Sequence, residues 1–195
     1  MNLAKHYRIE TIEAGVDEAG RGCLAGPVFA SAVILPSDFP FELLDDSKKL
    51  SEKKRKELRK IIEAKAVAWS IGIVDNLEID TINILQASIL AMHRAIDNLS
   101  TKPELLLIDG NKFNKYQDIE HQTIIKGDGK LCSIAAASIL AKTHRDEYMH
   151  KIAAEYPVYE WSQNKGYPTA KHRELIAKHG ITPYHRITFR LQKDS

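Results

Sequence analysis

Apolar and polar positions alternate along the chain in blocks that predict an α/β protein. Short apolar runs at residues 12–20, 27–35 and 66–74 are typical of strands, and a glycine-rich segment joins the first two. Ser51 suits the N-cap of a helix. The strongly charged stretch 52–65 that follows has few apolar positions, so we expect a helix that faces solvent.

The second half of the chain continues the alternation. From Ile82 to Leu99 apolar residues recur at spacings of three and four, which predicts an amphipathic helix packed on the core. The apolar run 105–108, ending in Asp109, suits a central strand. A weaker strand, a buried helix rich in small residues and a last helix are expected at residues 122–125, 131–142 and 170–178. The buried helix continues into a charged stretch that includes Arg145 and Asp146, and we expect this continuation to emerge into solvent. This order favours an α/β domain on a mixed sheet.

Composition narrows the classes of protein. A chain of 195 residues is long enough for one well-packed domain, and a net charge of +2 leaves any nucleic-acid affinity to local clusters of Lys and Arg. No apolar run approaches the ~20 residues of a membrane span, and residues 1–11 lack the apolar core of a secretory signal. Cys23 and Cys132 form no CxxC pair, which argues against structural zinc and a disulfide framework. We expect a cytoplasmic protein with reduced thiols and no membrane association.

Acidic residues mark the candidate chemistry. Asp17 and Glu18 end one apolar run and Asp109 ends another, so parallel neighbouring strands would bring them to one edge of the sheet. Adjacent strand residues point to opposite faces, so Asp17 and Glu18 can share a site only at a strand end or a distortion. Asp128 supplies a third acidic segment, just before the buried helix. The spacing favours a hard-cation site with oxygen ligands, for one ion or two.

Each acidic segment also has a purely structural interpretation. Asp109-Gly110 and Asp128-Gly129 are common turn dipeptides, and taken singly either one favours a turn. Two of the three segments directly end apolar runs, however, where unpaired carboxylates cost stability. The chain contains no GxSxG, HExxH or GxxxxGK[ST] motif, so a metal-activated water attacking phosphorus is the chemistry most consistent with these acids.

Several basic and aromatic residues lie near the acidic segments in sequence. A glycine-flanked arginine suits phosphate, because the backbone can approach closely and the guanidinium can bond in a bidentate manner. Tyr167 lies in a KGYP turn, where packing in a turn and stacking on a sugar or base are equally consistent with the sequence. The candidate phosphate-facing residues are Arg21, Lys48, Lys49, Lys126, Lys130, Lys142 and Arg145, and His185-Arg186 adds positive charge nearer the C-terminus.

Five motifs, in this order, resemble type 2 ribonuclease H and in particular bacterial ribonuclease HII. They are DEAGRG, DSKKLS, LLLIDG, KGD followed by SIAAASILAK and RD, and KGYPT. The resemblance covers about residues 14–189. It implies a ribonuclease H-like α/β fold, a five-stranded mixed sheet flanked by helices, with a small helical C-terminal extension. We therefore expect a single domain over 1–195, with a catalytic core at about 12–156 and the extension at about 157–195.

The same resemblance implies the activity. The expected partners are RNA–DNA hybrid, whose RNA strand is hydrolysed, and ribonucleotide-containing duplex DNA, which is incised 5′ to a single embedded ribonucleotide. The resemblance implies two Mg²⁺ or Mn²⁺ ions and products with 3′-hydroxyl and 5′-phosphate ends. We expect a monomer, and the sequence does not show which replication protein recruits it.

Individual roles follow residue by residue from the resemblance. The metal-binding carboxylates of the family match Asp17, Glu18, Asp109 and Asp128. Gly20, Arg21 and Gly22 match the segment that senses the 2′-hydroxyl and the scissile phosphate. Tyr167 matches the tyrosine that stacks at the ribonucleotide–deoxyribonucleotide junction, and Lys48, Lys142 and Arg145 are expected phosphate contacts.

The sequence departs from the family pattern at a few positions, and other functions are also considered. Ribonuclease HIII typically has a long N-terminal domain and a glutamate at the fourth acidic position, whereas here a short lead and Asp128 favour HII. Asn164 stands where the family often has histidine, and the short C-terminus predicts no extra duplex grip. The alternatives are a ribonuclease-H-like, structure-selective DNA endonuclease and a non-catalytic nucleic-acid-binding module. The module is disfavoured because clustered carboxylates repel a phosphate backbone unless cations neutralise them.

Overall fold

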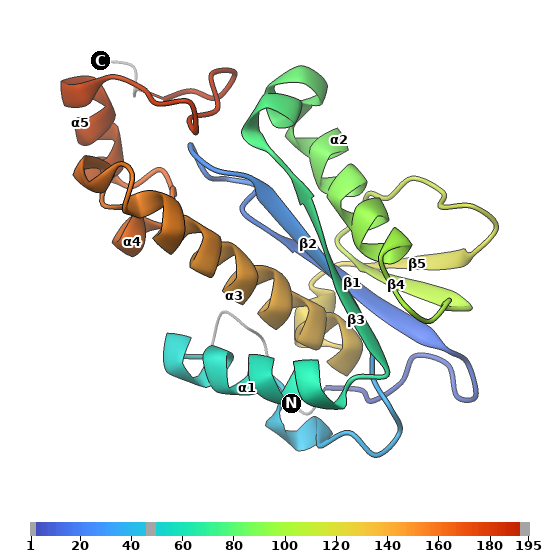
Figure 1. Ribbon diagram of the computed structural model, residues 1–195. Coiled ribbons are helices and arrows are strands. Elements are labelled where there is room, and N and C mark those ends of the chain that lie inside the picture. Colours follow the sequence, from blue (N-terminus) through green and yellow to red (C-terminus); the bar gives the residue numbers. More distant parts are fainter. Residues whose placement is uncertain (1–2, 46–49, 192–195) are drawn as a thin grey trace.

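The computed structural model describes residues 3–45 and 50–191, which form three layers with a mixed sheet between two groups of helices (Figure 1). The strands are β1 (Glu13–Ala19), β2 (Val28–Ile34), β3 (Ala68–Val74), β4 (Leu105–Asp109) and β5 (Glu120–Ile124). They lie in the order β3-β2-β1-β4-β5. β1 pairs parallel with β4 and antiparallel with β2, so the two apolar runs that end in acids are adjacent and parallel.

Helices occupy the remaining predicted positions. The α-helices of the described ranges are α1 (Glu52–Lys65), α2 (Asn76–Asp97), α3 (Cys132–Ala153), α4 (Trp161–Asn164) and α5 (Ala170–His179). Short 3-10 helices are η1 (Phe41–Leu43), η2 (Gly127–Gly129) and η3 (Pro157–Tyr159). Ser51 caps α1 as predicted, since its hydroxyl accepts a hydrogen bond from the backbone N–H of Lys54 at 3.2 Å. None of these helices is long and apolar enough to cross a membrane.

Helix α2 is longer than its apolar periodicity predicts. It begins at Asn76 because Asp75 and Glu78 form a capping box, a start signal that does not depend on apolar spacing. At Asn83 the backbone takes a φ of 67° and the helix kinks. The Asn83 side chain then accepts hydrogen bonds from the next backbone N–H groups and caps the second half of the helix, which carries the periodic apolar residues.

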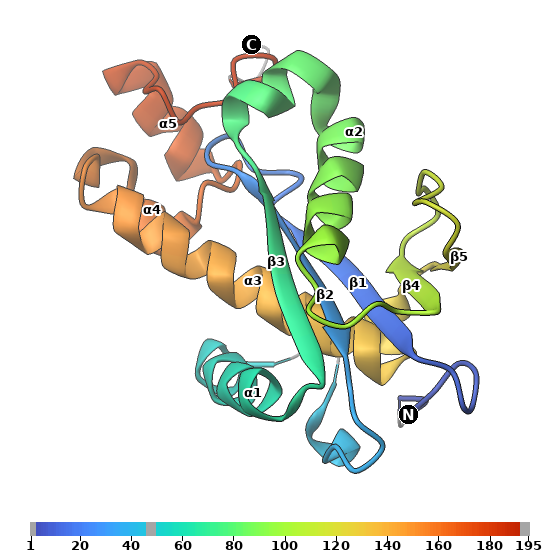
Figure 2. The same ribbon diagram turned by 45° about the vertical axis from the view of Figure 1, so that its right-hand side comes forward.

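Helices cover both faces of the sheet (Figure 2), and each face has its own core. On one face, Val16 and Ile108 belong to the cluster that packs against α2. On the other, Val33 packs with residues of α3 and with Leu58 and Ile62 of α1. Leu58 and Ile62 lie one helical turn apart and are fully buried, so α1 faces solvent on its outer side only.

Helix α3 lies close against β1. A Cβ built on Gly15 would sit 2.1 Å from the backbone of Ser133, so this approach requires glycine. The helix is buried as predicted, but its continuation does not emerge into solvent as we expected. Arg145 and Asp146 are 0% and 5% exposed, because the C-terminal segment covers this end of α3. The charge pattern alone cannot show that a later part of the chain returns to cover these residues.

Aromatic and histidine rings hold the C-terminal segment together. Tyr159 stacks on Trp161 with ring centroids 5.2 Å apart, and the His172 and His185 rings lie 5.5 Å apart beside them. The indole N–H of Trp161 donates to His172 Nε2 at 3.0 Å, and His185 Nδ1 accepts from the backbone N–H of Thr182 at 2.9 Å. Burial lowers the pKa of both histidines, and that of His185 falls to about 4.

We expect this histidine cluster to make the protein less stable in mild acid. His185 has a lowered pKa in the folded state, so between about pH 6.5 and pH 4 the unfolded chain binds the proton more readily. The contribution of neutral His185 to the free energy of unfolding is therefore fully present above pH ~6.5. It decreases as the pH falls toward 4, by at most about 3 kcal/mol. His185→Asn retains an acceptor and should flatten the melting temperature between about pH 7 and pH 5. The exposed His179→Asn is the control, and an unchanged slope in His185→Asn would contradict the assignment.

Candidate active site

Three acidic side chains meet at the carboxyl ends of two parallel strands. Asp17 and Glu18 come from β1 and Asp109 from β4, and all three line one cleft of about 330 Å³. The ladder between β1 and β2 continues through Ala19 without a break. Asp17 and Glu18 therefore share the cleft because they stand at the end of a strand, and no distortion of the pairing is needed.

The acidic cluster is electrostatically strained. Asp17 is 4% exposed, and burial raises its pKa well above the usual range for aspartate, with the charges of Glu18 and Asp109 raising it further. A hydrogen bond with the Ser138 side chain acts in the opposite direction. Burial also raises the pKa of Glu18, while Arg21, whose Nη1 lies 3.2 Å from Glu18 Oε1, lowers it.

The donor set fits a hard divalent cation. Carboxylate oxygens are the ligands that Mg²⁺ and Mn²⁺ prefer, and Glu18 Oε2 is buried with no hydrogen-bond partner in the described residues. In this conformation no three His, Cys, Asp or Glu side chains of residues 3–45 and 50–191 come close enough to coordinate one ion. Arg21 pairs with Oε1 of Glu18, so the other carboxylate oxygen, Oε2, is the one that would hold a cation.

Asp128 lies next to the cleft but does not line it. It belongs to η2 and is 2% exposed. The backbone N–H of Gly127 donates to Asp109 Oδ1 at 2.6 Å, which ties η2 to the end of β4. The structure therefore brings the third acidic segment to the same edge of the sheet, while the cleft wall itself is formed by the other three acids.

Most of the predicted substrate-facing residues surround this cleft. Those that line it are Gly20, Arg21, Gly22, Lys142 and Tyr167. Lys142 Nζ lies 5.2 Å from the centroid of the Tyr167 ring and 2.7 Å from Asp146 Oδ1. Tyr167 is 37% exposed, so its ring is accessible to a ligand. Lys48 and Lys49 lie outside the described residues.

The structure contradicts a phosphate contact from Arg145. This side chain is fully buried, and its guanidinium donates to the backbone carbonyls of Pro27, Lys165 and Ala25 at 3.0, 2.9 and 3.1 Å. A guanidinium committed to three buried carbonyls is not available to a phosphate. The prediction was wrong because it placed this part of α3 in solvent.

Three residues at the site were missed by sequence reasoning. Ser138 and Arg55 line the cleft, and Ser138 lies one helical turn before Lys142, so helical spacing could have identified it. Arg186, interpreted only as additional positive charge, is fully buried and donates to the carbonyls of Gly20, Arg21 and Gly26. No local pattern distinguishes such a buried arginine from a solvated one.

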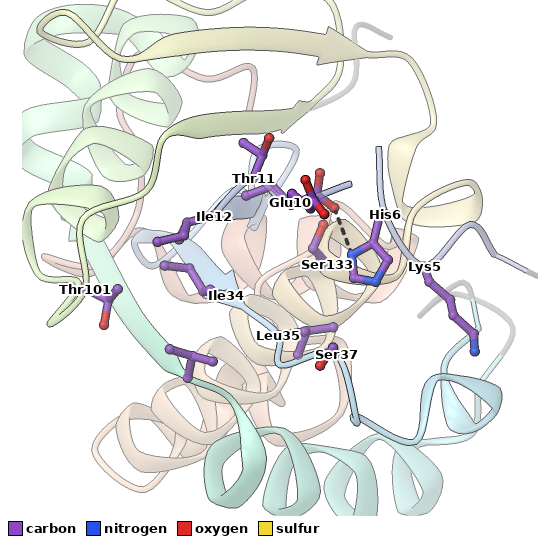
Figure 3. A pocket seen from close by; sticks show the side chains of 12 residues that line it. Lys5, His6, Glu10, Thr11, Ile12, Ile34, Leu35, Ser37, Thr101 and Ser133 are labelled. Atoms are coloured by element: carbon purple, nitrogen blue, oxygen red, sulfur yellow. Dashed lines mark ion pairs between the residues drawn. The ribbon is translucent and has the colours of Figure 1, made fainter. Parts of the chain in front are cut away.

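A second pocket, of about 310 Å³, lies at the opposite end of β1 (Figure 3). Its buried carboxylate, Glu13, accepts hydrogen bonds from the backbone N–H groups of Tyr7 and Arg8 at 3.0 to 3.1 Å. His6 Nδ1 lies 3.7 Å from the same carboxylate. Local backbone therefore satisfies this acid, in contrast to the cluster at the other end of the strand, where neighbouring carboxylates raise the pKa of Asp17.

Comparison with known proteins identifies the family. The family model of ribonuclease HII matches residues 14–192. Ribonuclease HII of Bacteroides thetaiotaomicron is 66% identical over 192 residues, which cover 98% of this chain and 96% of that protein. Ribonuclease HII of Bacteroides fragilis is 68% identical over 185 residues, covering 95% and 92%. The chain belongs to the ribonuclease HII family.

Solved structures agree with this assignment. Ribonuclease HII of Archaeoglobus fulgidus, seen in a complex with PCNA, aligns with a TM-score of 0.78 at 26% identity, covering 94% of this chain and 98% of that one. Bst-ribonuclease HIII in complex with Mn²⁺ aligns with a TM-score of 0.71 at 19% identity, covering 92% and 67%, and shows the common fold.

The resemblance and the fold inferred from the five motifs are confirmed, including the five-stranded mixed sheet and the C-terminal helices. As a ribonuclease HII, the protein is a metal-dependent endonuclease that hydrolyses the RNA strand of RNA–DNA hybrids.

Replacing Asp109 tests the electrostatic strain. Asp109→Asn removes one charge and retains an oxygen that can accept the Gly127 N–H, so in EDTA we expect a melting temperature at or above that of the wild type. Mg²⁺ should raise the melting temperature of the wild type by mass action and that of the variant less, and the variant should lose nuclease activity. Asp118→Asn, at a fully exposed acid, is the control. If Asp109→Asn unfolds the protein and no metal effect exists, Asp109 is structural.

Proposed function

We propose that Asp17, Glu18, Asp109 and Asp128 hold two divalent cations, Mg²⁺ or Mn²⁺, and that the enzyme also incises duplex DNA 5′ to a single embedded ribonucleotide. The observation that carries this proposal is the cleft, in which buried carboxylates whose repulsion a cation would relieve lie beside a glycine-rich turn. The Mn²⁺ complex of Bst-ribonuclease HIII supports the same class of ion.

Residues of the cleft have separate roles in hydrolysis of the phosphodiester. When bound, the cations would activate a water for attack on phosphorus and stabilise the leaving 3′ oxygen, giving 3′-hydroxyl and 5′-phosphate ends. Ser138 orients Asp17 through a side-chain hydrogen bond. Arg21 neutralises part of the charge on Glu18, and its guanidinium, at the exposed side of the cleft, is suited to bind the scissile phosphate.

The glycine-rich turn and Tyr167 are the residues proposed to recognise the ribonucleotide. The turn at Gly20, Arg21 and Gly22 offers backbone with little side-chain bulk, which suits contact with a 2′-hydroxyl, the group that distinguishes RNA from DNA. Tyr167 lines the same cleft, and we assign its ring to stacking on the nucleotide at the junction. Lys142, and Lys48 from outside the described residues, are proposed to contact phosphates.

We propose further that the enzyme acts as a cytoplasmic monomer, with residues 1–195 as one catalytic domain. The complex of the Archaeoglobus fulgidus ribonuclease HII with PCNA supports the proposal that a replication protein recruits this enzyme too.

The reaction is tested with an end-labelled DNA duplex that contains one ribonucleotide. With Mg²⁺ we expect a single cut on the 5′ side of the ribonucleotide, and no cut in EDTA or in an all-DNA duplex. Cleavage of long RNA–DNA hybrid without this cut would keep the metal site and refute the junction-reading roles of the turn and Tyr167. Cleavage of branched all-DNA substrates alone would indicate a structure-selective DNA endonuclease.

Lys142 tests the phosphate contacts. Lys142→Gln should weaken binding of hybrid and of ribonucleotide-containing duplex about equally, and should reduce the slope of log K against log salt by about 1. Binding titrations at several salt concentrations measure both quantities. Lys178→Gln, on the exposed side of α5, should leave the slope unchanged, and an unchanged slope in Lys142→Gln would exclude the contact.

A further inference from the structure

A fully buried arginine lies beneath the glycine-rich turn. Arg186 Nη2 donates to the Gly20 carbonyl at 2.8 Å, Nη1 to the Arg21 carbonyl at 2.8 Å, and Nε to the Gly26 carbonyl at 2.9 Å. Both prongs of the planar guanidinium fork thus bind successive carbonyls of the turn. The arginine comes from the C-terminal segment, which runs beside the connection between β1 and β2 (Figure 1).

These two hydrogen bonds fix the direction of two backbone donors. In a trans peptide the C=O and the following N–H point in opposite directions. Since the Gly20 and Arg21 carbonyls point at the buried guanidinium, the N–H groups of Arg21 and Gly22 point away from it, on the side of the turn that lines the cleft. Neither N–H donates to a backbone carbonyl within the described residues.

The surroundings hold the guanidinium in place. The backbone N–H of Arg186 donates to the Leu24 carbonyl at 2.9 Å, and the Gly26 N–H donates to the Tyr184 carbonyl at 2.9 Å. The Phe189 ring lies 5.0 Å from the guanidinium carbon. The backbone of Arg186 and its guanidinium are therefore both held in place. The positive charge of the guanidinium favours the orientation of the two peptide groups in which their carbonyl oxygens face it.

We propose that Arg186 is a positioning residue that aims the Arg21 and Gly22 N–H groups at the 2′-hydroxyl of the substrate, and so sets the preference for ribonucleotides. This inference rests on the proposed function of the turn and adds the group that orients it. Lysine cannot take this role, because a point-like ammonium lacks the rigid fork that binds two carbonyls at once.

The test is a thermodynamic cycle between Arg186 and the 2′-hydroxyl. Single-turnover rates are measured for the wild type and for Arg186→Lys on duplexes with one ribonucleotide and on matched duplexes with a 2′-fluoro nucleotide at that position. We expect loss of the hydroxyl to slow the wild type by about a hundredfold and Arg186→Lys by no more than about threefold. In the variant the Arg21 and Gly22 N–H groups are misaligned and no longer bind the 2′-hydroxyl. The same cycle is repeated for binding in the Asp109→Asn background, where cleavage is blocked.

The matched control is Arg145→Lys. Arg145 is equally buried and also donates to three carbonyls, but these are the carbonyls of Ala25, Pro27 and Lys165, outside the peptide groups of the turn. Loss of the 2′-hydroxyl should therefore slow Arg145→Lys by the same factor as it slows the wild type. Should Arg186→Lys fail to fold, Phe189→Leu, which loosens the guanidinium without removing it, must show the same non-multiplicative behaviour to a smaller degree.

The outcomes separate this inference from the proposed function. Multiplicative effects in Arg186→Lys, or equal departures from multiplicativity in both arginine variants, would make Arg186 merely structural and overturn the inference. A wild type indifferent to the 2′-hydroxyl would instead refute the proposed role of the turn itself, and with it the inference.

Discussion

Mutual repulsion among buried carboxylates is the constraint on which this structure depends. Asp17, Glu18 and Asp109 stand at the ends of two parallel strands, where Glu18 and Asp109 raise the free-energy cost of ionising Asp17. The surrounding core must supply the free energy that keeps them together, and it does so through a fully buried sheet centre and a helix held against β1 at Gly15. A divalent cation converts the same repulsion into attraction, so the strain is also the source of metal affinity.

The opposite electrostatic problem is solved a few residues later. After β1 the backbone turns away from the sheet and exposes carbonyls that no strand can pair. Arg145 and Arg186 satisfy these carbonyls from two directions, one from α3 and one from the C-terminal segment. The protein thus places a crowded acidic cluster on one side of the turn and two buried arginines bound to backbone carbonyls on the other, which makes the turn rigid without filling the cleft.

Local signals in the sequence were sufficient for the sheet, the long helices and the acidic edge. Apolar runs ending in Asp17 and Asp109 predicted two strands whose acids would share an edge if the strands were parallel neighbours, as they are, and Ser51 predicted the start of α1. The failures at Arg145 and Arg186 share one physical cause, which is burial by a distant part of the chain. Charge patterning could not show that Arg145 is covered by a segment that reaches it at Lys165, 20 residues later, and no spacing rule links Arg186 to a turn near the N-terminus. Long-range packing, unlike capping or periodicity, leaves no local trace.

The hydrogen bond between Gly20 and Arg186 joins residues 166 positions apart in the chain. Contacts of such sequence separation carry a large loop-closure cost and tend to form after local structure. On the ribosome the strands that carry the first acids are therefore made well before the arginine beneath the turn. A nascent chain that has not yet reached Arg186 would carry its acidic edge without the geometry to select a strand for cutting.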